Sequence, residues 1–183
     1  MAVKSKAISF DEICPIFVKL ILAFILPYVT YVFNNIIKHS TYPISWKCAK
    51  IIPIPKMNSE FRPIAILPFL SKVFETVLNR QIQRFINNNT ILSEWQSGYR
   101  PQHSCLTALL DVSENIRSSI DNSDVCFLTL LDHTKAFDTV DYKILCLHLS
   151  KMYNFSNSAT SLISSYLCNR QQAVFCNEMV SKI

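Results

Sequence analysis

The chain has 183 residues, of which 50% are hydrophobic and 17% are charged, and it contains a single glycine, Gly98. One glycine excludes glycine-rich phosphate loops, the dinucleotide-binding fingerprint and the nucleophile elbow, because each needs several glycines. The formal net charge is +5, but residues 1–100 hold 12 Lys or Arg against 5 Asp or Glu, whereas residues 101–183 hold 6 against 8. This asymmetry indicates either a polyanionic partner held by the first half or a solvated basic face.

The residues from 13 to 33 form an almost wholly apolar stretch that is long enough to span a bilayer. Pro15, Lys19 and Pro27 interrupt this stretch. A lysine within a membrane span costs about 2.5–3.5 kcal/mol at the bilayer centre and less near its edge. We therefore expect two core helices that are kinked or separated near Pro27, and a membrane anchor is the alternative.

A β-hairpin is predicted for residues 51–67. Isoleucines favour extended backbone in residues 51–56, while Pro53 and Pro55 confine that segment to an edge strand or a polyproline-like arm. A polar turn then leads back into the apolar residues 61–67. The cations Lys56 and Arg62 flank the tip of this hairpin.

Two helices are predicted next, over residues 71–86 and about 103–121, each with apolar residues at helical spacing on one face. In the second helix this face is expected to pack in the core. It consists of Leu106, Leu109, Leu110, Ile116 and Ile120. Gly98 lies in the turn between the helices, where a lone glycine implies a positive φ or a close backbone approach.

The run from Val125 to Leu131 is apolar except for one residue, which predicts a central strand buried on both faces. It ends on the carboxylate of Asp132. A carboxylate at the end of a buried strand is well placed to bind a metal ion on a rigid element. It can equally cap the turn that follows.

Two more helices and one strand are predicted towards the end of the sequence. Asp138 is expected to be the N-cap of the first helix, with Asp141 in its first turn. The second helix begins after Ser156, and residues 172–176 form the strand.

The seven cysteines are odd in number, widely spaced and mostly set among apolar residues. None forms a C-x-x-C pair, and the four histidines show no zinc-binding spacing. We expect buried free thiols in a reducing, intracellular compartment, with no disulfide partner.

Five segments, taken in order, resemble the reverse transcriptase of non-LTR (LINE-type) retrotransposons. They are SWKCAKIIPIPK, FRPIAILPFLSKVFE, QSGYRPQHSCLTALL, LLDHTKAFDTVD and SYLCNRQQAV, and the resemblance covers about residues 10–180. It implies an incomplete, helix-rich α+β fold: the fingers and the N-terminal part of the palm of a right-hand polymerase. Residues 1–40 would lead into the fingers as a helical segment, residues 41–122 would be the fingers subdomain, and residues 123–183 the first part of the palm.

The resemblance also assigns roles at the nucleotide site. Lys56 and Arg62 would contact the triphosphate of the incoming nucleotide, and two cations at a hairpin tip are suited to close over phosphates. Asp132 would be a catalytic residue and a ligand of both magnesium ions. Phe137 would lie under the incoming sugar and reject a 2′-hydroxyl, with core packing as its alternative.

Three residues would bind nucleic acid. Gln96, Gly98 and Arg100 would lie against template or primer, because glycine permits a close backbone approach and arginine contacts phosphate. The implied partners are an RNA template, a DNA primer and deoxynucleoside triphosphates. No membrane partner is expected.

The sequence lacks carboxylates that two-metal nucleotidyl transfer requires. It has no Asp-Asp pair and no aspartate after Asp141, and the glycine-rich palm motif is also missing. We therefore expect a truncated reverse transcriptase that binds its two magnesium ions incompletely and is inactive alone. The alternatives are a non-enzymatic nucleic-acid-binding remnant and a small membrane-anchored helical protein.

Overall fold

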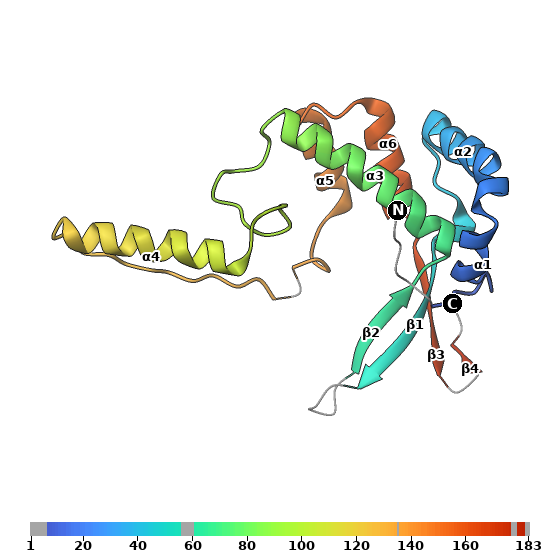
Figure 1. Ribbon diagram of the computed structural model, residues 1–183, viewed down its shortest axis with the longest axis horizontal. Helices are drawn as coiled ribbons and strands as arrows, with labels where there is room; N and C mark the ends of the chain where they lie inside the picture. Colours follow the sequence, from blue (N-terminus) through green and yellow to red (C-terminus); the bar gives the residue numbers. More distant parts are fainter. Residues whose placement is uncertain (1–6, 56–60, 135, 177–178, 182–183) are drawn as a thin grey trace. The chain divides into compact units, whose positions relative to one another are not determined.

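The computed structural model describes residues 7–55, 61–134, 136–176 and 179–181. Figure 1 shows the helices and strands in chain order. The chain divides into two compact units, the first formed by Met1–Gln81 with Asp141–Ile183 and the second by Ile82–Val140. Helices and one small sheet make up the fold, which confirms the mixed α+β class predicted from the sequence.

The first unit contains a four-stranded sheet with the strand order β2-β1-β3-β4. β1 (Cys48–Pro55) pairs antiparallel with β2 (Phe61–Ile66), which confirms the predicted hairpin. β1 also pairs in parallel with β3 (Gln171–Cys176), and β3 pairs antiparallel with β4 (Met179–Val180). The sheet therefore joins the early and the late parts of the sequence within one unit.

The N-terminal apolar stretch forms two helices, α1 (Pro15–Leu20) and α2 (Leu22–His39). Pro15 occupies the first position of α1, where its missing N–H costs nothing. The expected break near Pro27 is wrong: the helices separate at Ile21, and α2 continues through Pro27 at the expense of one backbone hydrogen bond. Within the part of the chain that the structure describes, no helix is long and apolar enough to cross a membrane.

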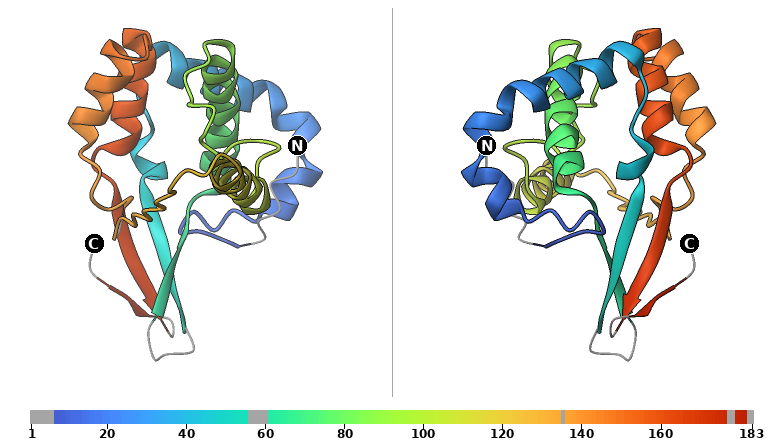
Figure 2. Two further views of the ribbon diagram at one scale, coloured as in Figure 1. Left: turned by 90° about the vertical axis from the view of Figure 1, so that its left-hand side faces the viewer. Right: turned by 90° about the vertical axis from the view of Figure 1, so that its right-hand side faces the viewer.

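The core of the first unit lies between α2, α3 (Phe69–Asn88) and α6 (Asn157–Leu167). Its buried residues are Ile36, Tyr42, Phe74 and Leu162. The ring of Phe74 lies edge-on to Phe33, with 5.0 Å between the ring centroids. Full burial of a side chain such as Phe74 stabilises the fold by about 1.5–3 kcal/mol. Figure 2 shows α5 (Tyr142–Lys151) beside α6, at the end of the sheet where β1 and β3 begin.

The N-caps of α5 and α6 differ in how well the sequence predicts them. Ser156 accepts a hydrogen bond from the Ala159 amide at 3.2 Å, as expected. The cap of α5 is Asp141, which accepts from the amides of the two residues that follow Tyr142. The prediction of Asp138 is wrong, because a capping carboxylate must directly precede the first helical residue to reach those amides.

The second unit contains α4 (Cys105–Asp121). A capping box begins it: the Ser104 amide donates to Thr107 Oγ1 at 2.9 Å, and the Thr107 amide donates to Ser104 Oγ at 3.2 Å. The helix is confirmed, but the predicted burial of its apolar face is wrong, since Leu106 is 65% exposed. An amphipathic pattern specifies a face that can pack, whereas burial also needs a partner surface.

The predicted central strand is also absent from the described residues. Residues 125–131 are extended, as Figure 1 shows, but no described strand pairs with them, and Phe127 is 89% exposed. A strand exists through its hydrogen bonds to neighbours, and the described residues provide none for this segment. The apolar run therefore has extended backbone without a sheet around it.

The cysteines are less buried than predicted. The six whose side chains are described are all free. Three of them, Cys105, Cys126 and Cys168, are exposed, and the other three are half-buried. The expected burial is therefore wrong for these thiols, since the apolar neighbours on which it was based are themselves exposed in much of the chain.

Candidate functional site

Arg62 is positioned by the hairpin of the first unit. It is the second residue of β2, opposite Ile54, and its side chain is exposed. Its guanidinium makes no hydrogen bond or ion pair with a described residue, which leaves its donors available to a ligand. Lys56, the other cation predicted here, lies outside the described residues.

The predicted nucleic-acid-binding residues share one loop in the second unit. Arg100 Nη1 donates to the carbonyls of Ser93 at 3.0 Å and Glu94 at 3.4 Å, and Gln96 Nε2 donates to the Gly98 carbonyl at 3.2 Å. These side chains therefore hold the loop together. Gln96 remains exposed and Arg100 half-exposed, so both also have donors that a phosphate could reach.

Gly98 does not adopt the backbone conformation predicted for it. Its φ is not positive, and the neighbouring Tyr99 takes a positive φ of 59° instead. A Cβ placed on Gly98 would meet no heavy atom within 4 Å. The prediction of a positive φ is wrong, and no close approach of another part of the described chain requires a glycine here.

An aromatic contact joins this loop to the segment after Asp132. The rings of Tyr99 and Phe137 meet edge to face, with 6.2 Å between centroids and 82° between planes. Both remain exposed, Tyr99 at 84% and Phe137 at 74%, so Phe137 does not pack in a core of the described chain. Nothing in the sequence predicts this pair, beyond the presence of two aromatic residues in separate motifs.

Asp132 lies in the second unit, in the extended, exposed part of the chain. The described residues bring no further ligands to it, since no group of three or more His, Cys, Asp or Glu among them could hold a metal ion. Asp138 and Asp141 do not complete such a group. The described residues therefore do not by themselves fit a two-metal site.

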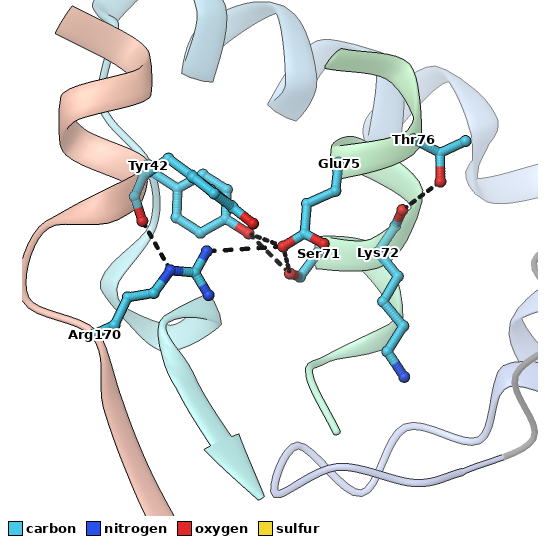
Figure 3. A network of polar contacts seen from close by, with 7 residues as sticks. Tyr42, Ser71, Lys72, Glu75, Thr76 and Arg170 are labelled. Atoms are coloured by element: carbon cyan, nitrogen blue, oxygen red, sulfur yellow. Dashed lines mark hydrogen bonds and ion pairs between the residues drawn. The ribbon is translucent and has the colours of Figure 1, made fainter. Parts of the chain in front are cut away.

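A network of polar side chains, not predicted from the sequence, links α3 to the start of β3 (Figure 3). The hydroxyls of Tyr42 and Ser71 form a hydrogen bond with each other at 2.8 Å, and Glu75 Oε1, an acceptor, lies 3.3 and 3.2 Å from them. Arg170 Nη2 lies 3.8 Å from the same carboxylate oxygen. No local pattern around Tyr42 predicts such a network, because its members come from three separate segments.

Burial in this region changes the acidity of its groups. Burial raises the pKa of the Tyr42 hydroxyl well above its usual range, partly offset by the hydrogen bond with Ser71. Burial, and next the nearby charge of Glu75, raise the pKa of Tyr166. Burial lowers the pKa of the Lys72 ammonium, which the charge of Glu75 partly offsets. Both tyrosines are therefore held neutral, as hydrogen-bonding groups of the core.

Residues 54–182 match the family described as reverse transcriptase (RNA-dependent DNA polymerase). This match covers well over half of the chain, and the chain belongs to that family. Membership confirms the resemblance seen in the five ordered motifs. Polymerases of this family use a nucleic-acid template, nucleotide substrates and divalent metal ions.

Several relatives come from transposons of Drosophila melanogaster. The probable RNA-directed DNA polymerase from transposon X-element is 31% identical over 97% of this chain and 20% of its own length. The corresponding protein of transposon BS is 26% identical over 91% of this chain and 19% of its own length. The RNA-directed DNA polymerase from mobile element jockey is 26% identical over 63% of this chain. The chain spans about a fifth of the length of the first two relatives.

Proposed function

We propose that this chain forms the fingers and the first part of the palm of an RNA-directed DNA polymerase encoded by a non-LTR retrotransposon. The observation that carries the proposal is the family match over residues 54–182. In this assignment residues 1–40 lead into the fingers, residues 41–122 form them, and residues 123–183 begin the palm.

The hairpin of β1 and β2 would hold the triphosphate of the incoming deoxynucleotide. Arg62 supports this role, because its exposed guanidinium has no partner among the described residues and offers paired N–H donors. Lys56, which lies outside the described residues, would supply the second positive charge. Phe137, exposed beside Tyr99, would lie under the nucleotide sugar and exclude a 2′-hydroxyl.

The loop that carries Gln96, Gly98 and Arg100 would contact the RNA template or the DNA primer. The open space around Gly98 supports this assignment: nothing in the described chain needs a glycine there, whereas a phosphate backbone lying on the loop would. Arg100 keeps N–H groups that its contacts to Ser93 and Glu94 do not use.

Asp132 would contribute one carboxylate to the site of two Mg²⁺ ions, which supply charge stabilisation in phosphoryl transfer when they are bound. Its exposure, and the lack of a partner among the described residues, leave both oxygens available. Because the sequence has no Asp-Asp pair and the described residues bring no metal-binding group to Asp132, the site needs further carboxylates. The chain alone would therefore not synthesise DNA.

Primer extension on an RNA template with Mg²⁺ tests this function. The 183-residue chain is assayed alone and as part of a joined protein, in which it replaces the equivalent segment of the X-element polymerase. We expect no synthesis by the chain alone and synthesis by the joined protein. In the joined protein Asp132→Asn abolishes extension, while the matched control Asp138→Asn retains it.

Three outcomes would contradict the proposal or part of it. Robust synthesis by the 183-residue chain alone would overturn the need for further carboxylates. Full activity of the joined Asp132→Asn variant would remove Asp132 from the catalytic site. A joined protein that binds template and primer but never extends the primer would favour a non-enzymatic nucleic-acid-binding role.

A further inference from the structure

A cavity of about 240 Å³ lies in the first unit, at the end of the sheet where two parallel strands begin. Lys47 directly precedes β1, and Arg170 directly precedes β3; both line the cavity. The amide of Gln171 donates to the Lys47 carbonyl at 3.2 Å, and Cys48 lies opposite Gln171 in the ladder. The parallel pairing thus sets two cationic side chains at the same end of the sheet.

Lys47 is an unusual lining residue because it is only 6% exposed. Its side chain has no hydrogen bond or ion pair with any residue that the structure describes. A positive charge on so buried a residue is costly without a partner, whereas an anion in the cavity would compensate it. Lys47 is therefore placed as a residue that binds an anionic ligand, and it is not part of a structural ion pair with a described residue.

Arg170 is held in place before any ligand arrives. Its Nε donates to the Tyr166 carbonyl at 2.9 Å, and its Cζ lies 4.0 Å from the centroid of the Tyr166 ring. Figure 3 shows its guanidinium directed towards Glu75. Since Glu75 offsets the charge of Arg170, the charge of Lys47 remains uncompensated. A guanidinium fixed in this way loses little conformational entropy when it binds a ligand.

The remaining polar groups at the cavity are neutral donors. Gln171 and Gln172 line it from β3, and both side chains are exposed. Each carboxamide provides two N–H donors. Together with one ammonium and one guanidinium, these groups match the several acceptor oxygens of a phosphate.

We propose that this cavity binds a phosphate group through Lys47, with Arg170 and the glutamine side chains as further donors. The cavity is lined by none of the residues assigned above: it includes Ala49 and Ala65, at the other end of the β1–β2 pair from Arg62. The inference rests on the proposed function insofar as that function brings phosphates to the chain. Two sources have the same chemistry: the backbone of a polynucleotide strand, and the phosphates of a free nucleotide or pyrophosphate.

The test measures binding to the 183-residue chain with a probe for each source. Fluorescence anisotropy measures the affinity for a short labelled single-stranded RNA at several salt concentrations. The shift of the urea unfolding midpoint measures stabilisation by inorganic pyrophosphate. Lys47→Met keeps the aliphatic stem and removes the charge. The matched control Lys151→Met removes an exposed lysine of α5 that does not line the cavity.

We expect Lys47→Met to weaken binding by about tenfold, the usual range for a lost charged hydrogen bond, and to reduce the salt slope by about one. Lys151→Met should leave the affinity and the salt slope unchanged. A second pair of variants guards against misfolding of Lys47→Met. Gln172→Glu places a negative charge at the cavity and should weaken binding, whereas Asn154→Asp adds the same charge at an exposed position outside it and should not.

The outcomes separate the two sources and can overturn the inference. If Lys47→Met and Gln172→Glu lose affinity for RNA, the ligand of the cavity is a polynucleotide backbone. If they lose only the stabilisation by pyrophosphate, the ligand is the phosphates of a free nucleotide or pyrophosphate. Variants that bind both probes as the wild type does, or a wild type that binds neither, would overturn the site. The proposed function is judged independently, by primer extension with the joined protein.

Discussion

The guanidinium of Arg170 stacks on the ring of Tyr166, at 4.0 Å from the ring centroid, and also donates through Nε to the Tyr166 carbonyl. The same guanidinium lies 3.8 Å from the carboxylate of Glu75 on α3. One side chain therefore connects the end of α6, the start of β3 and the first turns of α3. Because the tyrosine and the arginine are four residues apart, the contact also fixes how the chain leaves α6.

Replacement of Arg170 by alanine should lower the free energy of unfolding by about 1–3 kcal/mol, because a hydrogen bond and a cation–π contact are lost together. The ion pair with Glu75 adds little to this, since both side chains are more than a quarter exposed. Urea denaturation followed by circular dichroism measures the change. Arg80→Ala, at an exposed position of α3, is the control and should stay within about 0.5 kcal/mol of the wild type. Equal stabilities for the two variants would contradict a structural role of Arg170.

Stability should fall as the pH rises above about 10, the ordinary pKa of tyrosine. Burial raises the pKa of Tyr42 in the folded chain, so above that pH the folded state binds more protons than the unfolded state. The contribution of Tyr42 is present below pH 10 and is lost as the pH increases further. Tyr42→Phe removes it, and the slope of unfolding free energy against pH should become shallower by about 1.4 kcal/mol per unit. Urea midpoints between about pH 8 and about pH 11 measure both slopes, and equal slopes would refute the prediction.

Gly98→Ala should leave the free energy of unfolding within about 0.5 kcal/mol of the wild type. A Cβ there meets no atom within 4 Å, and the φ of Gly98 is one that alanine can adopt. Binding of a template–primer duplex should nevertheless weaken, because the added methyl group would meet the approaching backbone. Ser97→Ala is the control in the same loop. If Gly98→Ala binds as tightly as Ser97→Ala does, Gly98 does not contact nucleic acid.

Local sequence patterns correctly predicted the helices and strands that are determined by residues within them. The apolar spacing of residues 71–86 predicted α3, and Ser156 predicted the start of α6. The alternation of isoleucine and proline predicted the β1–β2 hairpin. In each case the residues that determine the element also lie within it, so that no distant contact was needed.

The predictions that failed concern choices that local patterns do not make. Pro27 and Asp138 are of residue types that commonly mark a helix boundary, but the helix boundaries fall at Ile21 and Asp141. Burial of α4 and of residues 125–131 failed because it depends on a partner surface, which periodicity does not specify. The residue pattern singled out Arg62 and Asp132, the family resemblance added Gln96 and Arg100, and the roles of all four stay predictions.

The apolar segment 125–131 should exchange its amide hydrogens rapidly in the 183-residue chain. Its backbone forms no hydrogen bond with a described residue, whereas the amides of α3 around the buried Phe74 lie in a packed helix. Hydrogen–deuterium exchange with mass spectrometry compares peptides from the two segments, and those from α3 serve as the protected control. In the protein joined to the remaining X-element residues, we expect the segment to become protected, because a buried strand requires neighbours for its N–H and C=O groups. Strong protection in the 183-residue chain alone would show that the segment pairs without them. No gain of protection in an active joined protein would show that Asp132 is presented by a loop rather than by a strand.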